Sequence, residues 1–452
     1  MLPRVCLGLV LVTASPVWSQ LTAIPYETPA ASADEAQMQI PPPMSGVAYP
    51  TIVGSEMRSN YLAAGLILNT TYADNVAVDG SAGPISDIIY SILPTIALDK
   101  NTPRQQLSLT YSPGFTLYQR TTGLDAANQT VALNVRYRLS QHMAIAVSDS
   151  FQKSSSVFDQ LTPLSGKGIS GSTQSQSAEV VAPYANRLSN TGNAVLSYQF
   201  SKNAMIGAGG DVTQSSYPKP GQALGLYNSN LYGGSVFYNY RLSRSQYIGA
   251  TYQYSRNQED PVSAQGNPGN TQTKIQTHTL LASYTVYLNQ TLSLSLSCGP
   301  QYSDATQSSS APSRSWAPSA MASIGWQRSN TNFVASYSRG VGEDTGLPGV
   351  YDSYSVNTSA RRRITRTWTL GVSASYFSNK NLTPLLSSSS PGGHTAWGAA
   401  SVQHSLSDHF SAELGYARVH QSYSGIAVIS DAPDNNQETI SVSYRLARPL
   451  GR

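Results

Sequence analysis

The chain has 452 residues, of which only 12% are charged, and 28 are Tyr against 8 Phe and 5 Trp. A soluble globular domain usually carries about 25% charged residues, so the composition argues against an ordinary soluble protein. The formal net charge of +4 is small and dispersed along the chain, and it therefore gives no support to nucleic-acid binding.

Residues 1–19 form a predicted secretory signal peptide. A basic residue, Arg4, precedes an apolar stretch over residues 5–12, and small residues follow near Ser19. The apolar stretch is too short to span a bilayer as a helix, and we place the cleavage site after Ser19. The mature chain then keeps one cysteine, Cys298, so no internal disulfide is expected. No later stretch reaches 18 consecutive apolar residues, which argues against a membrane-spanning helix.

Residues 20–57 form a predicted flexible, Pro-rich periplasmic leader. The stretch 21–57 contains six prolines, four acidic residues and no Lys or Arg. A segment of this composition buries too little apolar surface to form a packed core. The alternative is a short plug, or a peptide that docks on a partner.

Residues 58–452 repeat one unit, in which about a dozen residues alternate between apolar and polar side chains and end at a turn. In residues 247–255, for example, the even-numbered positions are Ile, Ala, Tyr and Tyr. The odd-numbered positions from 249 onward are Gly, Thr, Gln and Ser. This period of two predicts β-strands with one apolar face. The eighteen predicted strands lie near residues 60–73, 86–99, 104–119, 129–139, 142–155, 191–200, 203–215, 230–242, 245–257, 274–287, 290–303, 317–327, 331–340, 351–364, 367–378, 395–406, 409–421 and 436–447. Segments 191–200 and 351–364 are the weakest, so sixteen strands is the alternative.

The connections between these segments alternate in length. Long loops, the longest near 156–190, alternate with short turns at residues 100–103, 140–141, 201–202, 243–244, 289–290, 328–330, 365–366 and 407–408. Short periplasmic turns and long outer loops are typical of bacterial outer-membrane barrels, and an even strand number puts both termini in the periplasm. The predicted fold is therefore an all-β, transmembrane, antiparallel up-and-down β-barrel of about 18 strands in the outer membrane of a Gram-negative bacterium.

The direction of the two strand faces follows from the membrane. Only a closed sheet satisfies every backbone group in lipid, so the apolar faces must point outward. We expect Leu133, Ile248, Leu294, Leu370 and Val442 to face lipid, and Thr251, Gln253, Ser293 and Ser443 to face the lumen.

The first strands carry a sequence resemblance. The segment LILNTTYADN contains Tyr72-Ala73-Asp74-Asn75, and YSILPTIAL with its central Pro94 and LSLTYSPGFTLY follow it. These segments, about 60 residues in all, resemble outer-membrane β-barrel porins of Gram-negative bacteria, including the loosely defined porin type 2 group and relatives found near exopolysaccharide clusters. The resemblance implies a porin-like function but carries over no functional residue. Barrels of this family usually end on an aromatic residue. This chain departs from that pattern, because RLARPLGR follows Tyr444.

The sequence offers no constellation for catalysis. The six histidines do not occur in metal-spaced pairs, and HExxH, GxSxG and CxxCH are absent. His404 and His409 flank a predicted periplasmic turn, where solvated turn residues are the ordinary interpretation. We therefore predict no enzyme, no cofactor and no metal site.

Charges are distributed unevenly between the two ends of the predicted barrel. The predicted outer loops carry twelve acidic residues, Asp74, Asp79, Asp125, Asp159, Glu179, Glu259, Asp260, Asp304, Glu343, Asp344, Asp431 and Asp434, against five basic ones. The alternation predicts six pore-lining arginines near the periplasmic end, Arg136, Arg138, Arg241, Arg361, Arg363 and Arg445. One interpretation is a basic constriction that favours anions, beneath an acidic outer surface that binds divalent cations. The other is that polar chain ends collect charges of either sign.

Eighteen strands about 4.8 Å apart and tilted about 40–45° give a backbone diameter of roughly 36–39 Å, too wide for side chains alone to fill. The predicted function is passive diffusion of small hydrophilic solutes through an outer-membrane channel whose polar, weakly charged wall suits neutral solutes such as sugars. The alternative is a barrel component of a polysaccharide export or secretion assembly. The expected partners are outer-membrane lipid and small hydrophilic solutes, with no nucleic acid. The sequence leaves open a homo-oligomer or a periplasmic partner.

Overall fold

The structure is a computed structural model that describes residues 60–76, 85–102, 104–155, 185–219, 223, 226–262, 272–289, 291–307, 312–342, 350–382, 392–423 and 434–449. The predicted signal peptide, the predicted leader and most of the predicted loop 156–190 lie outside these residues. Within them, no helix is long and apolar enough to cross a membrane.

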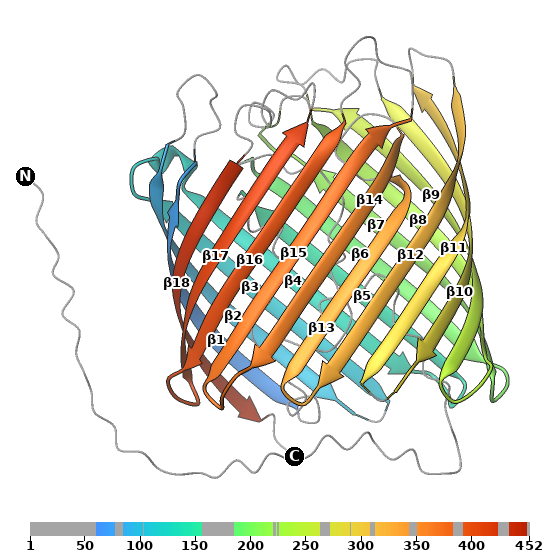
Figure 1. The fold of residues 1–452 in the computed structure, drawn as a ribbon, viewed down its shortest axis with the longest axis horizontal. Helices are drawn as coiled ribbons and strands as arrows, with labels where there is room; N and C mark the ends of the chain where they lie inside the picture. Colours follow the sequence, from blue (N-terminus) through green and yellow to red (C-terminus); the bar gives the residue numbers. More distant parts are fainter. Residues whose placement is uncertain are drawn as a thin grey trace, which may run out of the picture.

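Eighteen strands make up almost all of the described chain (Figure 1). Their bounds are β1 Tyr61–Ala73, β2 Asp87–Asn101, β3 Gln105–Tyr118, β4 Ala126–Arg138, β5 Met143–Ser154, β6 Arg187–Gln199, β7 Ala204–Ser216, β8 Tyr227–Arg241, β9 Gln246–Pro261, β10 Thr273–Tyr287, β11 Leu292–Gln307, β12 Ser313–Arg328, β13 Thr331–Gly342, β14 Tyr351–Arg363, β15 Trp368–Asn381, β16 Gly393–Ser405, β17 Phe410–Tyr423 and β18 Asp434–Pro449. A 3-10 helix, Thr122–Leu124, lies between β3 and β4. The two weakest predicted segments are both strands, β6 and β14, so eighteen is confirmed and sixteen is wrong.

The strands form one closed antiparallel sheet. Each strand pairs with its two neighbours in the chain, and β1 pairs with both β2 and β18, which closes the ring. The predicted up-and-down barrel is therefore confirmed. The eight short connections have two to four residues and lie together at the lower end in Figure 1.

Side chains at the start of the short turns fix the turn geometry. The Ser140 hydroxyl accepts hydrogen bonds from the backbone N–H groups of His142 and Met143, at 3.2 and 3.1 Å. The Ser407 hydroxyl likewise accepts from the backbone N–H groups of His409 and Phe410, and the Asn289 side chain accepts from the backbone N–H of Thr291. Ser and Asn stabilise turns in this way because their short side chains reach the backbone two or three residues on. The polar turn residues of the sequence thus define the short-turn end of the barrel.

Several strands run further toward the outer end than the alternation predicts. Strand β9 ends at Pro261 instead of near 257, and β12 begins at Ser313 instead of near 317. The backbone ladder continues there, since Asn228 pairs with Asp260 and Asp304 with Arg314. The outward-facing residues Gln258, Asp260 and Arg314 in these extensions are polar or charged, and the exposed Trp316 is an exception, so apolar alternation marks the strand poorly there.

Prolines interrupt the ladder without shifting its register. Between β10 and β11, pairing stops after Thr279 with Gln301 and resumes at Ala282 with Cys298, and Pro300 lies in the gap. Proline cannot donate a ladder hydrogen bond, and the neighbouring glycine lets the strands stay close. A Cβ added at Gly299 would overlap the carbonyl group of Leu280. Pro94 and Pro113 lie in a similar gap between β2 and β3.

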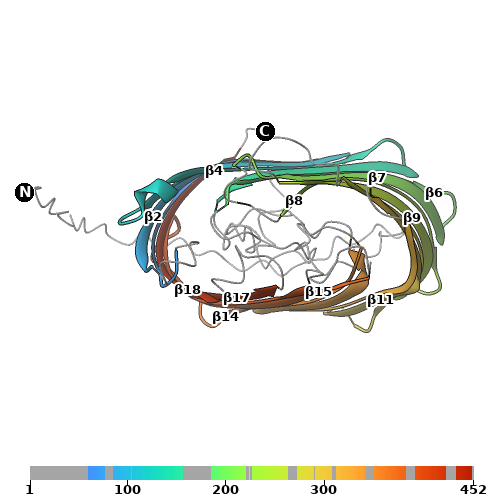
Figure 2. The same ribbon diagram turned by 90° about the horizontal axis from the view of Figure 1, so that it is seen from above.

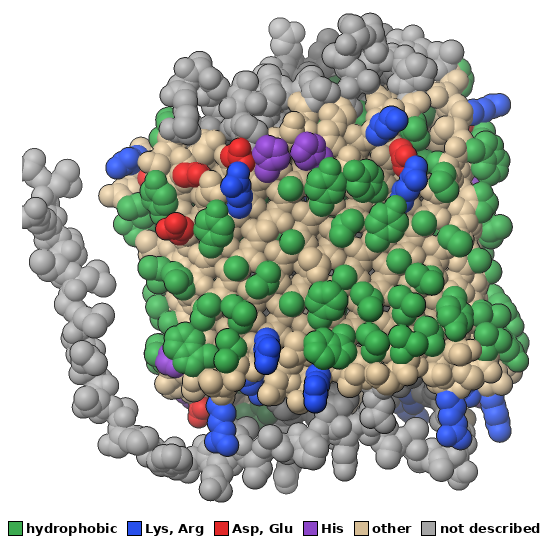
Figure 3. All heavy atoms as spheres, in the orientation of Figure 1, with side chains coloured by type: hydrophobic (Ala, Val, Ile, Leu, Met, Phe, Trp, Pro, Cys, Tyr) green, Lys and Arg blue, Asp and Glu red, His purple; other side chains and the backbone are tan. Residues whose placement is uncertain are grey.

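The outward face is apolar and the inward face is polar. Leu414 and Ile440 are each 61% exposed, and Figure 3 shows apolar side chains spread across the outer wall. The predicted lipid-facing residues Ile248 and Val442 belong to this exposed set, whereas Ser293 is buried on the opposite face. An apolar belt around a closed sheet is the signature of a transmembrane β-barrel.

The cross-section of the barrel is flattened (Figure 2). Two long walls face one another, and β9–β11 lie near one curved end. Inward side chains converge where a sheet curves sharply, which accounts for the complete burial of Ser295 and the near-complete burial of Thr277 and Thr285. The lumen therefore lies between the two long walls.

Candidate functional site

The lumen wall is lined by hydroxyl groups that bond to one another across neighbouring strands. The hydroxyl oxygens of Ser303 and Ser315 are 2.6 Å apart, and those of Ser338 and Ser355 are 2.7 Å apart. Further pairs join β10 to β11, β17 to β18 and β1 to β18. The strand pairing places both members of each pair on the inward face, because residues directly opposite in a ladder share one face. The wall is polar and nearly uncharged along much of its height.

Several inward-facing aromatic side chains are buried in the outer half of the barrel. Tyr351, Phe377, Trp397 and Tyr423 come from four neighbouring strands, β14–β17, and all four are buried. One hydrophobic cluster joins Tyr351 and Tyr423 to residues near the outer ends of β6–β9, namely Ala185, Tyr217, Ala223, Leu226 and Val262. The two long walls are therefore in contact near the outer end, and we call this contact region the outer constriction.

A carboxylate lies beside the outer constriction. Glu259 on β9 is only 1% exposed, and the Asn257 amide donates a hydrogen bond to its Oε1 atom at 3.1 Å. The Ser229 hydroxyl in turn donates to the Asn257 side-chain oxygen at 2.9 Å. Tyr227 and Tyr351 both interact electrostatically with Glu259. An acidic side chain is thus buried beside the contact between the two long walls.

The periplasmic half of the lumen is open to water. On β14, the inward residues Ser353 and Ser355 are buried, whereas Ser359 and Arg363, closer to the short turns, are exposed. On β16, Trp397 is buried, whereas Ser401 nearer the turn is partly exposed. In the described part of the chain, the lumen is a vestibule at the short-turn end that narrows toward the outer end.

The six predicted pore-lining arginines lie at the short-turn end but do not gather at one point. Arg136 and Arg138 lie on β4, Arg241 on β8, Arg361 and Arg363 on β14, and Arg445 on β18. The register pairs Arg241 with Tyr247 and Arg445 with Gly65, on the polar face of each strand. The four strands are separated by four to six steps around the ring of eighteen. At about 4.8 Å per strand, neighbouring groups are roughly 20–30 Å apart along the wall.

Some of these arginines have polar neighbours that the sequence did not single out. One guanidinium nitrogen of Arg361 donates to the Gln403 side chain at 3.3 Å, and Glu413 on β17 interacts electrostatically with Arg361. These long side chains meet over the small residue Gly371. Two guanidinium nitrogens of Arg241 donate to the Asn203 side chain, at 3.3 and 3.1 Å. The alternation also places Gln403 and Glu413 inward, so the same pattern that predicted the arginines could have found them.

The predicted acidic outer surface is only partly described. Asp79, Asp159, Glu179, Glu343, Asp344 and Asp431 lie outside the described residues. Glu259, Asp260, Asp304 and Asp434 lie on strands instead of in loops, because those strands extend further than predicted. Asp304 pairs with Arg314 at 3.2 Å, and Asp434 pairs with Arg418 at 2.9 Å. Among the described residues, no group of three or more His, Cys, Asp or Glu could hold a metal ion.

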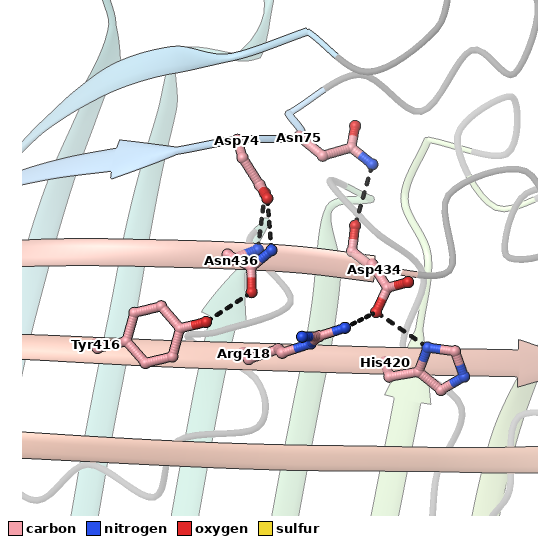
Figure 4. A network of polar contacts seen from close by, with 7 residues as sticks. All are labelled: Asp74, Asn75, Tyr416, Arg418, His420, Asp434 and Asn436. Carbon is pink, nitrogen blue, oxygen red and sulfur yellow. Dashed lines mark hydrogen bonds and ion pairs between the residues drawn. The ribbon is translucent and has the colours of Figure 1, made fainter.

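A polar network locks the seam where the first and last strands close the barrel (Figure 4). The Asp74 carboxylate accepts hydrogen bonds from the backbone and side-chain nitrogens of Asn436, at 2.8 and 2.5 Å. Asn75 donates to the Asp434 carbonyl oxygen at 3.2 Å, and Asp434 also contacts His420 at 3.1 Å. Asp74 and Asn75 belong to the Tyr-Ala-Asp-Asn segment that carried the family resemblance. Their role here is structural, because they tie β1 to β18.

A scan against protein-family models finds no match, and a search of curated protein sequences finds no relative. Among solved structures, the chain is similar to the outer membrane protein OpdK from Pseudomonas aeruginosa, with 10% identity, 86% of this chain and 99% of that chain covered, and a TM-score of 0.39. It is also similar to OccAB4 from Acinetobacter baumannii, with 10% identity, 87% of this chain and 99% of that chain covered, and a TM-score of 0.41. A third similar structure is OccK2 (OpdF) from Pseudomonas aeruginosa in complex with glucuronate, with 10% identity, 86% of this chain and 98% of that chain covered, and a TM-score of 0.42. Because these scores are low, no solute or functional residue is transferred from them.

Proposed function

We propose that this protein is an outer-membrane channel of a Gram-negative bacterium through which small hydrophilic solutes diffuse passively. The observation that carries the proposal is the closed ring of eighteen strands with an apolar outer belt and a hydroxyl-lined lumen. Such a wall offers weak hydrogen bonds to a passing solute and makes or breaks no covalent bond. The resemblance of the first strands to porins of the type 2 group supports the same proposal.

The outer constriction is the proposed site of size selection. Aromatic side chains there leave less room than the open vestibule, and water-filled passages discriminate mainly by their narrowest section. Trp397 and Phe377 are buried, inward-facing side chains on neighbouring strands, β16 and β15, beside the outer constriction on the side of the short turns. Replacing both by Ala removes two ring systems from the passage and should widen it.

The six arginines are proposed to give the vestibule a weak preference for anions. They lie on separate strands around the wall, so each acts on the local counter-ion concentration without forming a tight ring. The Debye length falls from about 10 Å at 0.1 M salt to about 3 Å at 1 M, so the preference should fade as salt rises. Because Glu259 lies at the outer constriction, removing its charge should strengthen the preference.

Single-channel conductance of the full-length protein in a planar bilayer tests the proposal. We expect discrete ion-conducting steps and a larger conductance for the double variant Trp397→Ala and Phe377→Ala. Trp368→Ala is the matched control, because Trp368 is exposed on the outer wall, and it should leave conductance unchanged. A protein that inserts into the bilayer but gives no conductance would contradict the channel function.

Selectivity is tested separately by the reversal potential across a salt gradient. We expect anion preference in the wild type at low salt, reduced in the triple variant Arg136→Gln, Arg138→Gln and Arg241→Gln. A cation preference in the wild type would show that Glu259 or other acidic groups govern selectivity, and the role proposed for the arginines would then be wrong.

A further inference from the structure

The short-turn end of the barrel carries a strong excess of positive charge. Within the described residues, fourteen Lys and Arg side chains lie at this end against three carboxylates, Asp99, Asp408 and Glu413, a net of eleven positive charges. Figure 3 shows Lys and Arg side chains along the lower edge of one face. We call this set the basic rim, and it consists of Lys100, Arg104, Arg136, Arg138, Lys202, Arg241, Arg244, Arg328, Arg361, Arg362, Arg363, Arg366, Arg445 and Arg448.

Only part of the basic rim can be explained by lipid. The alternation places four of its members, Lys100, Arg328, Arg362 and Arg448, on the outward face, where they can reach lipid headgroups. Six others are the inward arginines of the vestibule, and the remaining four, Arg104, Lys202, Arg244 and Arg366, lie in the short turns. The six vestibule arginines face the lumen, so lipid phosphates do not account for them, and the four turn residues are exposed.

The opposite end of the barrel lacks this excess. There, described basic residues are intermixed with acidic ones and form ion pairs with them, as in Arg314 with Asp304, Arg339 with Asp352 and Arg418 with Asp434. The accumulation of one sign of charge is therefore a property of the short-turn end and not of strand ends in general. A surface of this kind is suited to an acidic ligand.

The chain itself contains an acidic segment tethered to this end. Residues 20–57 carry Glu27, Asp34, Glu35 and Glu56 and no Lys or Arg. Tyr61, the first residue of β1, pairs with Pro449 and Asp99 at the short-turn end, so the chain that precedes β1 enters the barrel at the basic rim. We propose that the acidic leader, residues 20–57, docks on the basic rim of its own barrel.

Chain length makes the docking geometrically and energetically feasible. Twenty-six residues lie between Asp34 and Tyr61. A free chain of that length has a root-mean-square span of about 25–30 Å, which is less than the roughly 36 Å diameter of an eighteen-stranded barrel. Tethering over such a span gives an effective concentration on the order of millimolar. A leader with only millimolar affinity for the rim would then be bound about half of the time.

The docking proposal is tested by fluorescence anisotropy of a dye attached to the leader. The chain without the predicted signal peptide is labelled at Ser32→Cys in a Cys298→Ser background, because Cys298 is the only cysteine outside that peptide. Purified in uncharged detergent at 20 mM salt, the labelled leader should show high anisotropy, falling toward that of the isolated labelled peptide at 1 M salt. Equal anisotropy at the two salt concentrations would overturn the proposal.

Charge variants identify the rim as the binding surface. Anisotropy at 20 mM salt should fall toward the high-salt value in the rim variant, Lys202→Gln, Arg244→Gln and Arg366→Gln, and in the leader variant, Glu27→Gln, Asp34→Asn and Glu35→Gln. The matched control removes the same charge from the outer end, through Lys153→Gln, Lys274→Gln and Lys380→Gln, and should keep the wild-type value. An equal fall in the outer-end control would show that the effect is non-specific and would overturn the proposal.

A competition experiment distinguishes the leader from a separate acidic partner. Unlabelled peptide 20–57 at millimolar concentration should displace the tethered leader and lower its anisotropy. A freely moving leader combined with a rim that binds the added peptide would overturn the proposal and assign the rim to another periplasmic ligand. The anisotropy readout does not require conductance, so this inference can fail while the channel function holds, and the reverse.

Discussion

A charged residue placed at mid-height on the outer wall should destabilise the barrel far more than the same residue one position further along the strand. Val372 on β15 is 47% exposed and alternates outward, whereas the next residue, Ser373, alternates toward the lumen. Val372→Arg puts a guanidinium group into the hydrocarbon, and Ser373→Arg puts it into the vestibule. The two variants place the new charge on opposite faces of the sheet at nearly the same depth in the membrane.

The position of Val372 along the strand sets the expected magnitude. Trp368 and Tyr376 lie four residues before and after it on the same outward face. Eight residues at about 3.3 Å each, tilted by about 40°, rise roughly 20 Å, so the two aromatic side chains bracket most of the approximately 25 Å apolar band. Val372 therefore lies near the bilayer midplane, where an outward Arg costs about 2–4 kcal/mol of unfolding free energy. Ser373→Arg should change that free energy by no more than about 0.5 kcal/mol, as for other solvated substitutions.

Equilibrium unfolding in lipid vesicles measures this difference. The barrel is titrated with guanidinium chloride, and the fraction folded is followed by Trp fluorescence and by the gel-mobility shift between folded and unfolded forms. Similar losses of stability for the two variants would refute the assignment of faces. A larger loss for Ser373→Arg would reverse it and place the apolar side chains inside.

Three further predictions concern the wall itself. Gly299→Ala should lower the free energy of unfolding by about 1–3 kcal/mol, because the added methyl group overlaps the Leu280 carbonyl group. Denaturant titration measures this loss, and an unchanged unfolding midpoint would contradict the close approach of β10 and β11. Asp74→Ala should cost about 1–3 kcal/mol through the lost hydrogen bonds from Asn436 and should increase proteolysis at the seam before other sites; uniform proteolysis would count against a seam-specific role. A fluorophore attached to the exposed Cys298 should be quenched by nitroxide-labelled lipids and not by a water-soluble quencher; the opposite pattern would place it in the lumen.

The strand number and the short turns were predictable because the lipid imposes a strict rule on the sequence. Most outward positions within the apolar band are hydrophobic, so a period of two appears even in weak segments such as β6 and β14. The outer strand ends obey no such rule. Gln258 and Asp260 of β9 extend the ladder above the apolar band, where backbone hydrogen bonds alone maintain the strand.

The lumen was only partly predictable for a different reason. Alternation tells which residues point inward, and it placed the six arginines on the inward positions. It carries no information about which inward residues meet, since contacts such as that of Tyr351 with the cluster around Leu226 join strands far apart in the sequence. The outer constriction and the Glu259 carboxylate beside it therefore emerge only from the three-dimensional arrangement.

The flattened outline of the barrel has a consequence for how its permeability should be estimated. For a fixed perimeter, a circle encloses the greatest area, so any departure from it reduces the free cross-section while the number of strands stays the same. The number of strands therefore poorly predicts the size of the largest solute that can pass. The distance between the two long walls predicts it better. Solutes that are thin in one dimension, such as planar rings, should pass more readily than compact solutes of equal mass.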